Sequence, residues 1–146
     1  MYGQPRFLDE GFKYYNIFFN GVDVDYYFHS WKDEDTLQKI NKIYKPKKII
    51  VENQIENLES DFNIKFDLSY TNKDVQTTLS PLLSINKVGK LLMQSKEEYD
   101  LVVLTRTDVA PEGLTLKELF PRGVDEKAVY TNAIKGKFWK LTKSKK

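Results

Sequence analysis

The sequence contains no cysteine and only one histidine, His29. A chain without cysteine forms no disulfides and no thiolate metal sites, which fits a reducing compartment. A single histidine excludes histidine-rich metal clusters and mechanisms that use paired histidines. No apolar run approaches the ~18 residues that a membrane span requires, and the N-terminus has no apolar segment preceded by basic residues. We therefore expect a cytoplasmic protein without a membrane span or signal peptide.

The sequence also lacks the common motifs of nucleotide-binding and hydrolytic enzymes. The patterns GxGxxG, GxxxxGKS/T, GxSxG and HExxH are all absent. Dinucleotide oxidoreductases, P-loop NTPases and common hydrolases therefore have no motif support. The chain does have enough material for one folded domain, because its 146 residues are 40% hydrophobic and 14% aromatic.

Charge is distributed unevenly along the chain. The formal net charge is +2, but the last twelve residues hold six lysines and no acid, so residues 1–134 carry about −4. We assign residues 1–133 to one domain and residues 134–146 to a basic tail. Such a tail is either a solvated end or a docking segment for phosphates, nucleic acid or anionic lipid. Because the rest of the chain is slightly acidic, we do not expect nucleic acid as a partner.

The first half of the chain shows alternating helical and strand patterns. Apolar residues at helical spacing predict an amphipathic helix over residues 8–19. Alternation over residues 22–31 predicts a strand that ends near His29, and acids in the first turn open a predicted helix over residues 32–44. The β-branched run at residues 47–52 predicts a buried strand.

The second half begins with a polar stretch and then returns to clear patterns. Residues 53–73 are polar and indicate a surface excursion. Ser80 at an N-cap position and Pro81 at the first helical position predict a helix that runs to about Glu98. Residues 101–109, LVVLTRTDV, join a continuous apolar run to an abrupt polar switch. This pattern is typical of a central strand that is buried on both faces of a parallel sheet.

The order of these elements predicts an α/β fold, with a Rossmann-like, mostly parallel sheet flanked by helices. In such folds ligands bind beyond the carboxyl ends of the strands. That rule selects three segments, which are Gly3 to Arg6, His29 to Trp31, and Thr105 to Asp108. A strand would normally precede the first of these segments, and at most Met1 and Tyr2 remain of it. We therefore expect a fragment of a larger fold, whose unpaired strand edge would invite a partner chain or a second copy.

The residue types in two of these segments suit phosphate and metal binding. Gly3 permits close approach of the backbone to a ligand, Pro5 stiffens the turn, and Arg6 offers a fork for phosphate. Asp108 is a candidate ligand for Mg²⁺ or Mn²⁺. Arg106 either binds a phosphate or forms an ion pair with Asp108.

The third segment allows two readings of each aromatic side chain. His29 is either a base or ligand contact, or a hydrogen-bonded structural residue. Trp31 either stacks on a nucleobase or packs in the core. The residue types alone leave both pairs of alternatives open.

Five segments in the same order resemble a family of glycosyltransferase-like proteins from bacteria and large viruses. They are YGQPRF, DVDYYFHSWKDED, IYKPKKIIVE, SPLLSINKVGKLL and YDLVVLTRTDV. Members of that family open with a strand that runs into a Gly-Gln-Pro-Arg loop. They continue with segments similar to DVFIHTW, LYxPKxxxIE, SxxYSIxKxxxL and YDxVIRxRxDL. The resemblance covers roughly residues 2–110, and LTLKELFP and KAVYTNA extend it to about residue 133.

The resemblance implies a GT-A-like domain that binds a nucleoside-diphosphate sugar and transfers the sugar. It places the opening loop against the nucleotide, with His29 as a further candidate contact; the loop residues are Gly3, Gln4, Pro5 and Arg6. It also puts Asp108, with Arg106, in the place of the metal-binding acid. A divalent Mn²⁺ or Mg²⁺ ion held there would help to stabilise the departing diphosphate. A viral member of the family would lie in the host cytoplasm.

The chain departs from the family pattern at four places. One is the start of the predicted third long helix, where Pro81 and two leucines replace the methionine and aromatic residues of the family. Leu104 stands where the family has the first arginine of its Arg-x-Arg-x-Asp pattern, the first strand is missing, and the lysine tail stands where an acceptor-binding half should begin. We therefore expect a truncated glycosyltransferase-like domain. The alternative is a non-catalytic remnant or interaction module of the same fold.

Overall fold

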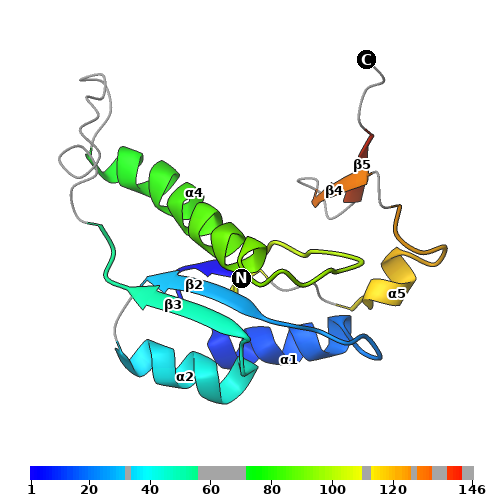
Figure 1. The fold of residues 1–146 in the computed structure, drawn as a ribbon, viewed down its shortest axis with the longest axis horizontal. Helices are drawn as coiled ribbons and strands as arrows, with labels where there is room; N and C mark the ends of the chain where they lie inside the picture. The colour runs from blue at the N-terminus through cyan, green and yellow to red at the C-terminus, as the bar shows by residue number, and fades with distance from the viewer. Residues whose placement is uncertain (32–33, 56–71, 110–112, 126–127, 133–137, 143–146) are drawn as a thin grey trace.

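A computed structural model of the chain describes residues 1–31, 34–55, 72–109, 113–125, 128–132 and 138–142. Its helices and strands follow one another in the order shown in Figure 1. They are β1 (Tyr2–Gly3), α1 (Leu8–Phe18), β2 (Tyr27–Trp31), α2 (Glu34–Tyr44), β3 (Lys48–Glu52), α4 (Asn72–Met93), α5 (Leu116–Leu119), β4 (Ala128–Asn132) and β5 (Phe138–Thr142).

The first three strands form a parallel sheet in the order β1-β2-β3. Tyr2 of β1 lies opposite His29 of β2, and His29 lies opposite Ile50 of β3. Helices α1 and α2 cover one face of this sheet, and α4 covers the other (Figure 1). The chain therefore has an α/β fold with a small parallel sheet between two helical layers.

The sheet is held by apolar contacts on both faces. On the face of α1 and α2, the core includes Tyr15, Phe28 and Tyr44, which are almost completely buried. On the face of α4, Tyr27 packs with Val88 and other apolar side chains of that helix. Every residue of β2 is buried, since helices cover the strand from both sides.

Most predictions for the first half of the chain are confirmed. The helix predicted at residues 8–19 is α1, the helix at 32–44 is α2, and the strand at 47–52 is β3. The strand predicted at residues 22–31 begins later than expected, because β2 starts only at Tyr27, and it continues to Trp31, past the predicted end near His29. The polar stretch at residues 53–73 lies mostly outside the described residues.

The predicted start of the third long helix is wrong. The helix α4 begins at Asn72, so Ser80 and Pro81 lie inside it rather than at its N-terminus. Interior proline removes one helical hydrogen bond and costs about 3 kcal/mol relative to alanine. Buried side chains of α4 lie both before and after Pro81 in the sequence, namely Ser80 before it and Ser84 and Val88 after it. We infer that their packing offsets the lost hydrogen bond, so the helix continues through the proline. It ends at Met93, before the predicted end at Glu98.

The predicted central strand at residues 101–109 is also wrong. This segment forms no strand, and most of its apolar side chains are exposed, with 56% of Val102 and 52% of Leu104 accessible to solvent. The only backbone hydrogen bond between this described segment and β1 runs from the Tyr2 N–H to the Thr105 carbonyl, at 3.0 Å. Since β1 has only two residues, it offers the apolar half of the segment no strand to pair with.

Helix α5 packs Leu116 and Leu119 against the core, whereas β4 and β5 stand apart from the parallel sheet (Figure 1). Strands β4 and β5 pair with each other in an antiparallel hairpin (Figure 1). The second strand of this hairpin falls within residues 134–146, which the sequence assigned to a basic tail. Residues 134–137 and 143–146 of that tail lie outside the described residues. No helix in the described ranges is long and apolar enough to cross a membrane.

Candidate functional site

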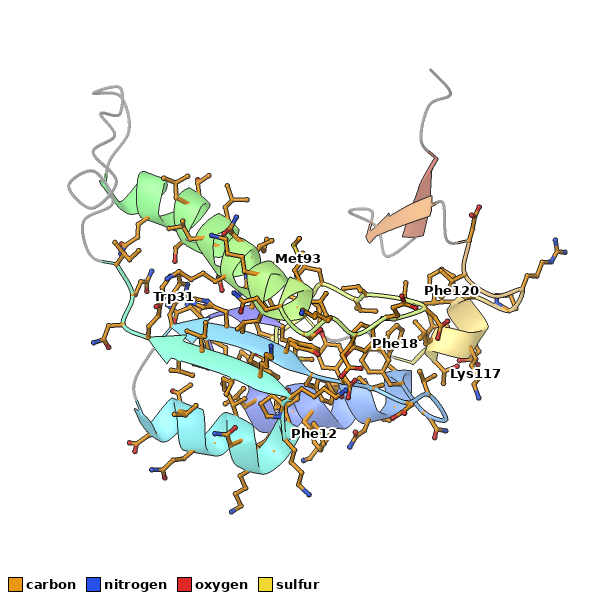
Figure 2. The ribbon with its side chains drawn as sticks, viewed as in Figure 1. Phe12, Phe18, Trp31, Met93, Lys117 and Phe120 are labelled. Carbon is orange, nitrogen blue, oxygen red and sulfur yellow. The ribbon has the colours of Figure 1, made fainter. Side chains whose placement is uncertain are left out.

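The carboxyl ends of the three parallel strands lie along one edge of the sheet. They end at Gly3, Trp31 and Glu52. Figure 2 shows Trp31 at this edge, with α4 lying over it. Ligands of parallel α/β sheets bind at such an edge. The accessible side chains along this edge are therefore the candidates for ligand contact.

The two segments that the sequence predicted to form a site are in contact at this edge. Thr107 is buried, and its Oγ1 donates a hydrogen bond of 2.8 Å to the carbonyl of Arg6. The same hydroxyl lies 3.5 Å from the carbonyl of Gln4. Residues 105–108 are therefore fixed against the loop that follows β1.

Helix α1 anchors residues 105–109 from below. The Tyr15 hydroxyl lies 2.6 Å from Thr105 Oγ1, and 2.9 and 2.6 Å from the carbonyls of Arg106 and Val109. Burial raises the pKa of Tyr15 to about 12, so its hydroxyl stays protonated and can donate. A Cβ on Gly11 would lie 2.2 Å from the Thr107 carbonyl oxygen, so this approach of helix and loop requires glycine.

Arg106 and Asp108 form a two-pronged ion pair. Arg106 Nε donates to Asp108 Oδ1 at 2.8 Å, and Arg106 Nη2 donates to Asp108 Oδ2 at 2.5 Å. The carboxylate raises the pKa of Arg106 further above its ordinary value. Only 11% of the Asp108 side chain is exposed, against 35% of Arg106. The arginine is thus the more accessible partner.

The donor set around Asp108 does not fit a divalent metal in this arrangement. Magnesium and manganese sites use several oxygen ligands, whereas here Arg106 binds both carboxylate oxygens. No group of three or more histidine, cysteine, aspartate or glutamate side chains in the described ranges could hold a metal. A metal at Asp108 would first have to displace Arg106.

The loop after β1 is held by its backbone and by one side chain. Gly3 has a φ of 97°, which favours glycine. Its N–H donates to Ser84 Oγ at 2.8 Å, and its carbonyl accepts from Ser30 Oγ at 3.0 Å. Gln4 Nε2 donates to Gln54 Oε1 at 2.7 Å.

Pro5 and Arg6 complete this loop. Pro5 is half-buried and Arg6 is exposed. No ion pair or side-chain hydrogen bond joins the Arg6 guanidinium to the residues that the structure describes. Of the charged side chains that the sequence selected here, Arg6 is therefore the most open to a ligand.

His29 lies beneath this loop and is completely buried. Its Nδ1 lies 2.7 Å from Ser84 Oγ, and its Nε2 lies 3.0 Å from Glu52 Oε1. Burial, and then the positive charge of Lys87, lower the pKa of His29 to about 4. The Glu52 carboxylate also binds Lys87 Nζ, so it is not free to favour an imidazolium. A neutral imidazole donates from Nε2 to Glu52 and accepts at Nδ1 from Ser84.

Ser84, His29 and Glu52 form a line that resembles a catalytic triad in its residue types. The line does not expose a nucleophile, because Ser84 and His29 are both completely buried. Ser84 Oγ also accepts from the Gly3 N–H. This network links α4, β2, β3 and the loop, and the structural reading of His29 fits it better than a ligand contact.

Trp31 is also in the core rather than on the surface. Its ring is buried and meets the His29 ring edge-on, with 4.6 Å between centroids. Lys87 Nζ lies 5.2 Å from the centroid of the Trp31 ring, within the range of a cation–π contact. Trp31 therefore presents no open face for a nucleobase.

Six of the seven predicted site residues lie at this edge, whereas His29 is the buried middle residue of β2. Gln4 and Arg6 contact Thr107, between Arg106 and Asp108, and the His29 side chain reaches the loop through Ser84. The sequence did not single out Ser84, Lys87 and Glu52. The rule that selected His29 at a strand end would also have selected Glu52, whereas Ser84 and Lys87 had no signal beyond their helical spacing.

Comparison with known proteins adds no relative. No protein-family model, curated protein or solved structure significantly matches this chain.

Proposed function

We propose that the chain binds a nucleoside diphosphate, as part of a nucleoside-diphosphate sugar, on a Rossmann-like, GT-A-like sheet. The hydrogen bond from Thr107 to the Arg6 carbonyl carries this proposal. It joins two candidate segments that lie 101 residues apart in sequence, at the edge where parallel sheets bind ligands. The order of the five segments that resemble glycosyltransferase-like proteins supports the choice of ligand.

Two arginines supply the charge that a diphosphate requires. Arg6 is exposed and offers all of its donors. Arg106 uses Nε and Nη2 for Asp108, and a guanidinium has five N–H groups, so donors remain for a phosphate oxygen. In this proposal Asp108 orients Arg106. The chemistry of sugar transfer stays a prediction from the resemblance, since Asp108 and Glu52 are both in ion pairs.

Calorimetric titration with UDP and with GDP tests the proposal. We expect binding of one of them to the unmodified protein, and Arg6→Ala to weaken it by about tenfold or more, because a hydrogen bond to a charged group contributes about 1.5–3 kcal/mol. Arg122→Ala is the matched control, because Arg122 is also exposed and lies outside this edge. Absence of binding near millimolar nucleotide, or equal weakening by both variants, would overturn the proposal. Repeating the titration with Mn²⁺ tests the metal prediction at Asp108.

A further inference from the structure

A large groove lies at the other end of the sheet from the candidate site. Its volume is about 720 Å³. One wall is residues 22–27, which lead into β2, and the other wall is residues 101–105. In Figure 1 the yellow-green chain after α4 runs out beyond the helix and returns toward the N-terminus, which forms the second wall.

The groove continues the line of β1. Tyr2 pairs with His29 on one side and donates its N–H to the Thr105 carbonyl on the other. At Tyr2, therefore, β2 and residue 105 are separated by one strand, which corresponds to about 9.6 Å between them. The Met1 nitrogen donates to the Tyr27 carbonyl at the closed end of the groove. Beyond Met1, the groove is bounded on both sides as a strand would be by its two neighbours, but none of the described residues occupies that position.

The wall at residues 101–104 has unused hydrogen-bonding capacity. No backbone hydrogen bond joins these four residues to the part of the chain that the structure describes. Their apolar side chains are also largely exposed, Val102 and Leu104 most of all. An unpaired edge beside exposed apolar side chains favours addition of a strand.

The two faces of the groove are apolar. Ile85, Val88 and Leu92 of α4 line one face, and Phe19 and Leu116 line part of the other face. A strand covered on both faces is typically a continuous apolar run. The chemistry of the groove therefore matches a run of such residues and not an alternating polar strand.

The outer rim of the groove is acidic. Five acids and one lysine line it, and the lysine, Lys47, is paired with two of the acids. The acids are Asp23, Asp25, Glu97, Glu98 and Asp100. An occupant with lysine or arginine at the outer end would match this charge.

We propose that this groove binds an extended segment of a partner protein as an added β-strand. The segment is a run of about four apolar residues, preceded by lysine or arginine, and it lies in line with β1, between the wall at residues 22–27 and the wall at residues 101–104. Its backbone hydrogen bonds satisfy the open edge, and its basic end lies at the acidic rim. The proposal concerns a different surface from the nucleotide site and does not depend on it.

A covalently attached strand tests whether the groove accepts this occupant. The extension Lys-Lys-Val-Ile-Val-Val is fused directly before Met1, and a matched control carries proline in place of both the first and the last valine, because proline cannot donate a strand hydrogen bond. We expect amide exchange at residues 101–104 to slow by at least about tenfold in the first fusion only. Equal exchange in the two fusions would overturn the proposal.

The same segment added as a free acetylated peptide tests binding between molecules. We expect it to bind the unfused protein and not the strand-bearing fusion, whose groove is filled. Val102→Lys should weaken this binding by at least about tenfold, since it would bury a charge at the edge. Val109→Lys is the control, because Val109 is similarly exposed and does not line the groove. A stable dimer of the unfused protein that the peptide fails to dissociate would instead assign the groove to a second copy and overturn the proposal.

Discussion

At the scale of single residues, two helical glycines differ sharply in their surroundings. Gly11 lies in α1 against the Thr107 carbonyl, whereas Gly89 lies in α4 with open space around the position that a Cβ would take. The close approach at Gly11 is what brings residues 105–108 to the loop after β1. The site therefore depends on the absence of a side chain at Gly11, and no pattern in the sequence singles that position out.

Alanine substitutions at these two glycines should have opposite effects. Gly11→Ala puts a Cβ 2.2 Å from the Thr107 carbonyl oxygen, so we expect a loss of roughly 1–3 kcal/mol in the free energy of unfolding and weaker nucleotide binding. Gly89→Ala meets open space in a helix, so we expect a gain of up to about 1 kcal/mol. Urea unfolding of both variants measures this. Equal stability of the two variants would contradict the close contact between α1 and residue 107.

At the scale of elements, the sequence was most informative where local pattern and packing agree. The helices α1 and α2 and the strand β3 were predicted because each has a clear apolar pattern and clear ends. The start of α4 was predicted wrongly. Ser80 and Pro81 have the residue types of a helix N-terminus, but packing against the sheet keeps them inside a longer helix. Residues 101–109 have the composition of a central strand, but pairing depends on a neighbour that composition does not reveal.

The proline inside α4 gives a prediction for that helix. Pro81→Ala restores an N–H donor in the helix interior, so we expect an increase of up to about 3 kcal/mol in the free energy of unfolding. Leu82→Ala is the control on the next residue, since Leu82 is exposed and should change stability little. Denaturant unfolding monitored by circular dichroism at helical wavelengths compares them. A lower stability of Pro81→Ala would show that the packing of α4 requires the proline geometry.

At the scale of the whole molecule, one buried polar network connects the layers. His29 of β2 contacts Ser84 of α4 and Glu52 of β3, and Ser84 holds Gly3 of β1. The sequence predicted a strand that ends near His29, but His29 is the middle residue of β2. Its burial was not predicted either, because burial depends on how α4 lies over the sheet. A residue with this position contributes to the stability of the entire fold, and its titration should be visible in global unfolding.

The lowered pKa of His29 predicts acid sensitivity of a definite sign. The unfolded chain protonates His29 below about pH 6.5, whereas the folded chain resists protonation down to about pH 4. The stabilisation is therefore present above pH 6.5 and is lost as the pH falls, by about 2 kcal/mol between about pH 7.5 and pH 5. The buried Met1 amine, with a pKa lowered to about 5, adds a loss of the same sign.

The variant His29→Gln tests this, because it removes only the contribution of the histidine. Its free energy of unfolding should fall less steeply with decreasing pH than that of the unmodified protein. Identical slopes for the two proteins in urea titrations across this range would mean that His29 takes up its proton in the folded state.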